Sequence, residues 1–234
     1  MRVIALLSGG KDSVAAVEVA RSHGWDVVAG LRMVLQEDDA YMFHTPNLDV
    51  VEAVAQCLDM PLVSASARPD PVEEVGDLEQ ALARAKEDFS LDGIISGALA
   101  SEYQRTRIDR IGHRLGLRTF APLWHKDPAT YMAGLTDWDV RFSRVAADGL
   151  DEDWAGARLD AARLEALRAK RLHIAGEGGE YETLVLDAPC YSSRIVVEDA
   201  KVEATASRAT WRVQRWRLES KGPPHRRGLS TSAQ

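Results

Sequence analysis

The strongest constraint in this chain is the stretch at residues 8–13, which reads Ser-Gly-Gly-Lys-Asp-Ser. The preceding residues 2–7 form a short apolar run rich in strand formers, and Val14, Val17 and Ala20 then recur at helical spacing. A strand therefore delivers a glycine turn to the start of a helix. Two glycines permit backbone angles closed to other residues, and the free N–H groups of a first helical turn favour an anion. The stretch predicts an exposed turn that binds phosphate.

The side chains of this loop suit the same ligand. Ser8 and Ser13 supply hydroxyl donors, and Lys11 supplies a point charge suited to phosphate. Asp12 supplies a carboxylate that suits a magnesium ion. The loop is shorter than a Walker A loop and lacks the Gly-x-Gly-x-x-Gly spacing of dinucleotide-binding proteins. The alternative is a bare glycine turn without a ligand, which explains neither the two serines nor the lysine.

Strand and helix signals alternate beyond this loop. Strands are expected at residues 26–34, 61–65, 93–96 and 118–121. Helices are expected from an N-cap at Asn47 through Leu58, across residues 75–89, and after a second N-cap at Ser101. This order predicts an α/β fold with a doubly wound parallel sheet and right-handed crossovers.

The expected sheet also predicts where a ligand binds. Ligands of such sheets bind at the carboxyl ends of the strands, near the point where the strand order reverses. The loop at residues 8–13 lies at such an end, as do the segments 33–44 and 97–103. We therefore expect these three segments to converge on one nucleotide, with Met33 and Gly97 beside it.

The alternation of strands and helices stops at residues 122–128, and we place a domain boundary there. The prediction is a nucleotide-binding domain at residues 1–121, a smaller C-terminal α+β domain at 122–220 and a disordered tail at 221–234. Within the second domain we expect a strand at 139–146, a helical region at 151–172 and antiparallel strands over 195–219.

Composition limits the classes of protein. With 45% hydrophobic and 28% charged residues, no apolar run long enough to cross a bilayer and no signal-peptide pattern, the chain is expected to be cytoplasmic and free of the membrane. The net charge of -7 argues against a broad nucleic-acid footprint. Cys57 and Cys190 form no Cys-x-x-Cys pair, so neither a zinc site nor a disulfide is indicated, and Cys57 is expected in the core.

A second motif lies at residues 177–183, which read Glu-Gly-Gly-Glu-Tyr-Glu-Thr. Three carboxylates around two glycines are costly unless a cation, a proton or a backbone donor compensates them. In an extended segment, Glu180 and Glu182 project to one face, and Tyr181 and Thr183 to the other. Composition alone leaves a glycine hairpin with a charged outer face and a binding loop as equal alternatives.

Two further positions carry open alternatives. Glu102 and Arg105 fall in the first turns of a helix beside the ligand end of the fourth strand, so a ligand contact and a surface ion pair are equally expected. Trp124 either packs a hinge or, with His125 and Lys126 beside it, forms a wall of the site.

Taken together, these segments resemble the diphthine ammonia ligase family, within the N-type ATP pyrophosphatases or PP-loop superfamily. The resemblance covers residues 1–220 and implies the adenine nucleotide alpha hydrolase-like (HUP) type of sheet. The loop at residues 8–13 matches the superfamily. The segments that match the family are Met-Phe-His-Thr at 42–45, Ser-Glu-Tyr-Gln-Arg-Thr-Arg at 101–107, Leu-Trp at 123–124, the motif at 177–183 and Leu-Asp-Ala-Pro at 186–189.

The resemblance implies a reaction. ATP with Mg²⁺ adenylates the diphthine carboxylate on translation elongation factor 2, and ammonium then displaces AMP, giving diphthamide, AMP and pyrophosphate. The partners it implies are that elongation factor and ammonium, with no membrane and no free nucleic acid, and a homodimer is allowed. Free ammonium is the expected nitrogen source.

The resemblance also implies roles for residues. Catalytic roles fall to Lys11, Asp12, Glu180 and Glu182, and Asp12 is the magnesium ligand. Contacts to ATP fall to Ser8, Gly9, Gly10, Lys11, Asp12, Ser13, Met33 and Gly97. Contacts to the acceptor, including its quaternary ammonium group, fall to His44, Glu102, Tyr103, Arg105, Trp124, Glu177, Gly178, Gly179, Tyr181 and Thr183.

Two other functions remain open. One is a transfer-RNA-modifying enzyme of the same superfamily, against which the net charge and the missing Cys-x-x-Cys pair weigh. The other is an ATP-binding sensor that does not turn ATP over. Release of AMP and pyrophosphate separates an enzyme from such a sensor.

Overall fold

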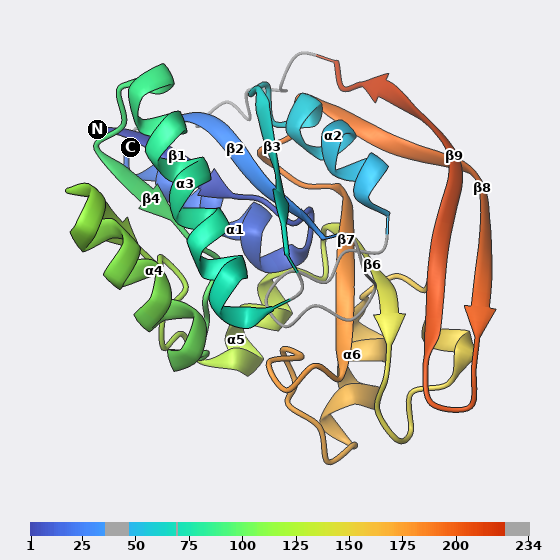
Figure 1. Ribbon diagram of the computed structural model, residues 1–234. Helices are drawn as coiled ribbons and strands as arrows, with labels where there is room; N and C mark the ends of the chain where they lie inside the picture. The colour runs from blue at the N-terminus through green and yellow to red at the C-terminus, as the bar shows by residue number, and fades with distance from the viewer. Residues whose placement is uncertain (36–46, 69, 223–234) are drawn as a thin grey trace, which may run out of the picture.

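The computed structural model describes residues 1–35, 47–68 and 70–222, which fold around two β-sheets (Figure 1). The described strands of the first sheet are β1 (Arg2–Leu6), β2 (Asp26–Leu35), β3 (Leu62–Ala67), β4 (Gly93–Ile95) and β5 (Arg118–Phe120). They are all parallel and lie in the order β3-β2-β1-β4-β5. The order reverses between β1 and β4, so the predicted doubly wound α/β sheet is confirmed.

Helices cover both faces of this sheet. They are α1 (Lys11–Ser22), α2 (Leu48–Cys57), α3 (Pro71–Phe89) and α4 (Glu102–Leu115). Because side chains alternate along a strand, Val3 and Ala5 of β1 pack with α1 and α2, whereas Ile4 packs with α3 and α4. Cys57 is fully buried in the first of these layers, as expected. No helix in the described part of the chain is both long and apolar enough to span a membrane.

The second sheet is antiparallel and contains β6 (Asp139–Val145), β7 (Tyr181–Asp187), β8 (Ser193–Ala204) and β9 (Ala209–Ser220), in the order β7-β6-β9-β8. The expected antiparallel strands over residues 195–219 are therefore confirmed. The shorter elements beside this sheet are α5 (Pro128–Gly134), the 3-10 helix η1 (Glu152–Trp154) and α6 (Ala161–Arg168). One apolar core runs from α1 and α2 into this sheet, with Phe142 buried edge-to-face against Trp154 and Tyr181.

The expectation of a continuous helical region at residues 151–172 is wrong. Only η1 and α6 are helical, and the chain between them runs along β6. Gly156 N donates to Phe142 O, Phe142 N donates to Ala157 O, and Leu159 N donates to Val140 O. Strand β9 pairs with β6 only near its end, so this segment supplies the partners that the remaining β6 backbone needs.

Asn47 directly precedes α2, as expected, but its side chain does not cap the helix. The amide instead joins α2 to the second sheet. Its Nδ2 donates to Trp211 O at 2.9 Å, and its Oδ1 accepts from Val213 N at 2.8 Å. The two bonds tie a helix of the first layer to the backbone of β9.

We predict that Asn47→Ala lowers the free energy of unfolding by about 2 kcal/mol, because it leaves a backbone donor and a backbone acceptor of β9 without partners. Urea unfolding measures the effect. The control is Gln56→Ala, an exposed position on the same helix, which should change stability by less than about 0.5 kcal/mol. Equal effects of the two substitutions would show that the link between α2 and β9 contributes nothing.

Candidate active site

The loop at residues 8–13 connects β1 to α1 at the carboxyl edge of the parallel sheet (Figure 1). Gly9 has a φ of +78°, a backbone conformation that favours glycine. The serine hydroxyls brace the turn. Ser13 Oγ donates to Gly10 O at 3.0 Å, Ser8 Oγ donates to Ser13 Oγ at 3.2 Å, and Gly10 N donates to Ser8 Oγ at 3.3 Å. The loop therefore holds its shape through its own side chains.

Strand β7 docks against this loop. It is an edge strand of the second sheet, so one side of its backbone is available for pairing. Val185 N donates to Gly9 O at 2.9 Å, and Lys11 N donates to Thr183 Oγ1 at 3.0 Å. The two motifs singled out in the sequence are thus in direct contact, although they lie far apart along the chain.

Lys11 does not project from an exposed turn, and that expectation is wrong. Its relative exposure is 4%, because the segment that leads into β7 covers it. Lys11 Nζ donates to Asp12 Oδ2 at 2.8 Å and to Ala175 O at 2.7 Å. It also lies 5.5 Å from the centroid of the Tyr181 ring. An ammonium group has three donors, so one remains for a phosphate.

Asp12 is held on both sides. One oxygen accepts from Lys11, and the other accepts from the Tyr131 hydroxyl at 2.8 Å. Burial and the charge of Asp12 raise the pKa of Tyr131 well above its ordinary value, so this hydroxyl stays a donor. Tyr131 lies on the short helix α5, and sequence reasoning missed it because no motif marks it.

The acidic turn at residues 177–180, directly before β7, contains two carboxylates that bind different parts of the structure. Glu180 Oε1 accepts from His173 N at 2.9 Å and its Oε2 accepts from Gly178 N at 2.8 Å, so this side chain holds the turn together. Glu177 Oε2 accepts from Ala100 N at 3.1 Å, which links the turn to the segment after β4. Burial, followed by the nearby charge of Asp12, raises the pKa of Glu177. These carboxylates lie where a cation would be favoured.

Glu182 lies opposite Arg144 in the register of β6 and β7, with 3.4 Å between the carboxylate and guanidinium atoms. Burial raises the pKa of Glu182 to about 7, and the charge of Arg144 opposes that rise only in part. A carboxyl group with such a pKa gains or loses its proton near neutral pH.

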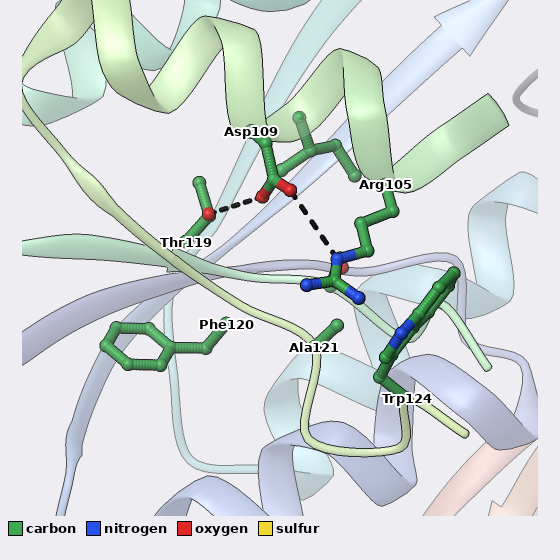
Figure 2. Close-up of a pocket in the computed structure, with 8 residues that line it drawn as sticks. Arg105, Asp109, Thr119, Phe120, Ala121 and Trp124 are labelled. Atoms are coloured by element: carbon green, nitrogen blue, oxygen red, sulfur yellow. Dashed lines mark hydrogen bonds and ion pairs between the residues drawn. The ribbon is translucent and has the colours of Figure 1, made fainter. Parts of the chain in front are cut away.

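The end of β4 forms the third side of the site. Gly97 packs so closely on the start of α1 that a Cβ atom there would lie 2.7 Å from the backbone carbon of Asp12. Ser101 caps α4 as expected, accepting from Gln104 N at 3.3 Å. A cavity of about 190 Å³ lies beside this segment, and Arg105 and Trp124 are among the residues of its wall (Figure 2).

The aromatic residues expected to contact the acceptor do not present free faces. Arg105 lies 4.4 Å from the centroid of the Trp124 ring, and the ring of His125 stacks against the same tryptophan at 4.7 Å. Tyr181 is 3% exposed, and its hydroxyl donates to Ile174 O. The guanidinium of Arg107 covers the Tyr103 ring at 3.2 Å. Glu102 is exposed at the start of α4.

Not every residue predicted for the site reaches the loop. Met33 lies at the carboxyl end of β2, but its side chain is 3% exposed and packs in the core shared with α3 and α4. His44 lies outside the described residues. Among the described residues, no cluster of three or more histidine, cysteine or acidic side chains is arranged for a metal ion. Asp12 at the phosphate loop still fits magnesium, which commonly binds one carboxylate together with substrate phosphates.

The fold and the loop define the class of protein. A parallel sheet that delivers a Ser-Gly-Gly-Lys-Asp-Ser turn to the N-terminus of a helix, at the reversal of strand order, is a nucleotide-binding fold of the PP-loop type. Family comparison then gives the particular family. The diphthamide synthase N-terminal domain matches residues 1–119, and the diphthamide synthase C-terminal domain matches residues 127–218. The chain belongs to the diphthamide synthase family, so it is an ATP-dependent ligase and the resemblance is confirmed.

Curated relatives agree with this family. Proteins named diphthine-ammonia ligase from Danio rerio and Bos taurus are each 33% identical to this chain. The alignment covers 85% of this chain and 87% of the Danio rerio protein, and 96% of this chain and 95% of the Bos taurus protein. A protein of the same name from Schizosaccharomyces pombe is 34% identical over 86% of this chain and 37% of its own length.

We predict that Glu182 makes stability depend on pH. The folded carboxyl keeps its proton up to about pH 7, whereas an ordinary one loses it near 4.5, so the folded state binds more protons in between. Stability should therefore fall as the pH rises from 4.5 to 7, by on the order of 2 kcal/mol. Urea unfolding of the wild type and of Glu182→Gln at pH 5 and pH 8 measures this contribution.

The glutamine variant should lose less stability between the two pH values than the wild type. The matched control is Glu198→Gln on the exposed face of β8, which should follow the wild type. If Glu182→Gln shows the same fall in stability as the wild type, Glu182 does not titrate in this range.

Proposed function

We propose that this chain amidates the diphthine carboxylate of translation elongation factor 2 in the cytoplasm, using ATP and ammonium. The carboxylate attacks the α-phosphate of ATP and releases pyrophosphate, and ammonia then displaces AMP from the acyl adenylate. The observation that supports the proposal is the contact of the phosphate loop with β7 and with the segment before it, which brings the nucleotide motif and the family motif together.

The phosphate loop supplies the stabilisation that the first step needs. Negative charge develops on pyrophosphate as it leaves, and preorganised donors aimed at that charge lower the barrier. The backbone N–H group of Gly9 and the remaining Lys11 donor suit this role, and Gly10, whose N–H binds Ser8 Oγ, keeps the turn in shape. Asp12, oriented by Tyr131, would hold Mg²⁺, and the ion when bound would neutralise charge on the phosphates.

The acidic residues suit the second step. Ammonium is a cation that must lose a proton before nitrogen can attack the acyl adenylate. Glu177, half-buried next to Asp12, lies where an added cation relieves the repulsion between two carboxylates. Of the two glutamates expected to be catalytic, Glu182 has a pKa of about 7, which suits a general base, but its partner is Arg144 of β6 and no residue of the phosphate loop, so its catalytic role stays a prediction. Glu180 acts indirectly in this proposal, by holding the turn.

The test is formation of AMP and pyrophosphate by the purified chain with ATP, ammonium and elongation factor 2 carrying diphthine. We predict that Lys11→Ala and Ser13→Ala each lower AMP formation at least a hundredfold, since each removes a group that binds phosphate or braces the loop. The control, Lys201→Ala, removes an exposed lysine of β8 and should keep wild-type activity.

Each alternative function gives a different result. A sensor would bind ATP but release neither AMP nor pyrophosphate. A transfer-RNA-modifying enzyme would show tight, salt-sensitive transfer-RNA binding in a filter titration. Wild-type turnover by folded Lys11→Ala and Ser13→Ala proteins would contradict the role given to the loop.

We further predict that ammonium chloride supports the reaction and that glutamine does not. Glutamine hydrolysis commonly requires a reactive cysteine nucleophile, and burial raises the pKa of both Cys57 and Cys190 to about 12, which keeps these thiols protonated. The measurement is amidated elongation factor by mass spectrometry with each nitrogen source. Equal product from glutamine, in a preparation free of amidase, would contradict this prediction.

A further inference from the structure

The cavity beside the phosphate loop has an arginine in its wall that is prepared for an anion. It lies at the carboxyl ends of β4 and β5, under the start of α4 (Figure 2). The guanidinium of Arg105 stacks on the ring of Trp124 at 4.4 Å. Its Nε lies 3.5 Å from Asp109 Oδ2, and Asp109 Oδ1 in turn accepts from the Thr119 hydroxyl at 2.5 Å. Stacking and this ion pair fix the plane of the guanidinium before any ligand arrives.

The two terminal nitrogens of Arg105 are the groups left to bind a ligand. Nε faces Asp109, while within the described residues neither Nη atom has a hydrogen-bond acceptor. Figure 2 shows one Nη atom directed between Ala121 and Trp124 and the other directed toward the side of Phe120, and all three of these residues line the cavity. Two parallel N–H groups on a fixed plane match the two oxygens of a carboxylate or phosphate.

The size and charge of the cavity favour a carboxylate. At about 190 Å³ the cavity is smaller than the roughly 300 Å³ at which pockets for whole small molecules begin, so it accepts one end group of a larger substrate. Asp109 offsets part of the arginine charge and would repel a phosphate dianion more than a carboxylate monoanion.

The cavity and the phosphate loop are neighbours. Ser96 lines the cavity, and the next residue, Gly97, contacts the backbone of Asp12 at the start of α1. A carboxylate on Arg105 therefore lies on the β4 side of the loop that would hold the triphosphate. Because a carboxylate must approach the α-phosphate to be adenylated, this is a suitable side from which to present it.

The geometry points to the Arg105 cavity as the subsite that binds the acceptor carboxylate before its adenylation. This inference rests on the proposed function for the identity of the acceptor. Trp124 acts in this subsite as the support for Arg105, since its ring contacts both the Arg105 guanidinium and the His125 ring.

The kinetic test uses the full chain and elongation factor 2 carrying diphthine. Arg105→Gln should raise the KM for the acceptor at least tenfold while the dissociation constant for ATP stays within twofold. Arg105→Lys keeps the charge but lacks the two parallel N–H groups of the guanidinium, so it should recover less than a third of the acceptor affinity lost in Arg105→Gln. The control, Arg110→Gln, removes an exposed arginine of the same helix and should leave both constants unchanged. An unchanged acceptor KM in Arg105→Gln, or an equal loss of ATP affinity, would overturn the inference.

A second measurement does not depend on turnover. Glycine betaine, which joins a carboxylate to a quaternary ammonium group, is titrated into ¹⁵N-labelled protein while the Arg105 side-chain signals are followed by NMR. They should shift with glycine betaine and not with choline, which lacks the carboxylate, and the response to inorganic phosphate should be weaker. Equal shifts with choline, or stronger ones with phosphate, would overturn the carboxylate assignment. If these shifts appear but no AMP forms with the elongation factor, the proposed function fails and the carboxylate subsite stands for another acceptor.

Discussion

The docking of β7 on the phosphate loop is the interaction on which the rest of the site depends. A bond from Val185 N to Gly9 O and another from Lys11 N to Thr183 Oγ1 join the edge of an antiparallel sheet to a turn of a parallel sheet. An edge strand carries backbone groups that need partners, and the loop supplies one. The apolar core continues across the same junction, so the two sheets are packed together as well as hydrogen-bonded.

This junction brings charges together that would repel one another elsewhere. Asp12 at the start of α1 and Glu177 in the turn before β7 lie close together, so that the charge of Asp12 contributes to the raised pKa of Glu177. Lys11, buried between the loop and this turn, is the compensating cation. Tyr131 adds a neutral donor to the same carboxylate. A site built in this way keeps its charged groups oriented but leaves an excess of negative charge. That excess suits cationic ligands, and the loop itself suits an anionic one.

The order of the strands explains why the groups suited to phosphate and those suited to a carboxylate lie side by side. The loop after β1 and the segment after β4 lie side by side because the strand order reverses between them, and Gly97 lets their backbones touch. One side of this contact offers phosphate donors, and the other offers the Arg105 fork. The segment that leads into β7, which includes the acidic turn, then covers Lys11 of the loop. Three kinds of binding chemistry thus meet at one edge of the sheet.

The sequence by itself determined the phosphate loop, the parallel sheet and the family, because glycine turns, apolar periodicity and motif spacing are local properties of the chain. It also placed the start of α2 after Asn47 and the side-chain cap of α4 at Ser101. What it could not determine was which partner each side chain finds. The Asn47 amide binds β9, residues 156–159 pair with β6 in place of a helix, and Lys11 is buried. Each outcome depends on backbone groups of the second sheet that need partners, and only the tertiary structure brings those groups within reach.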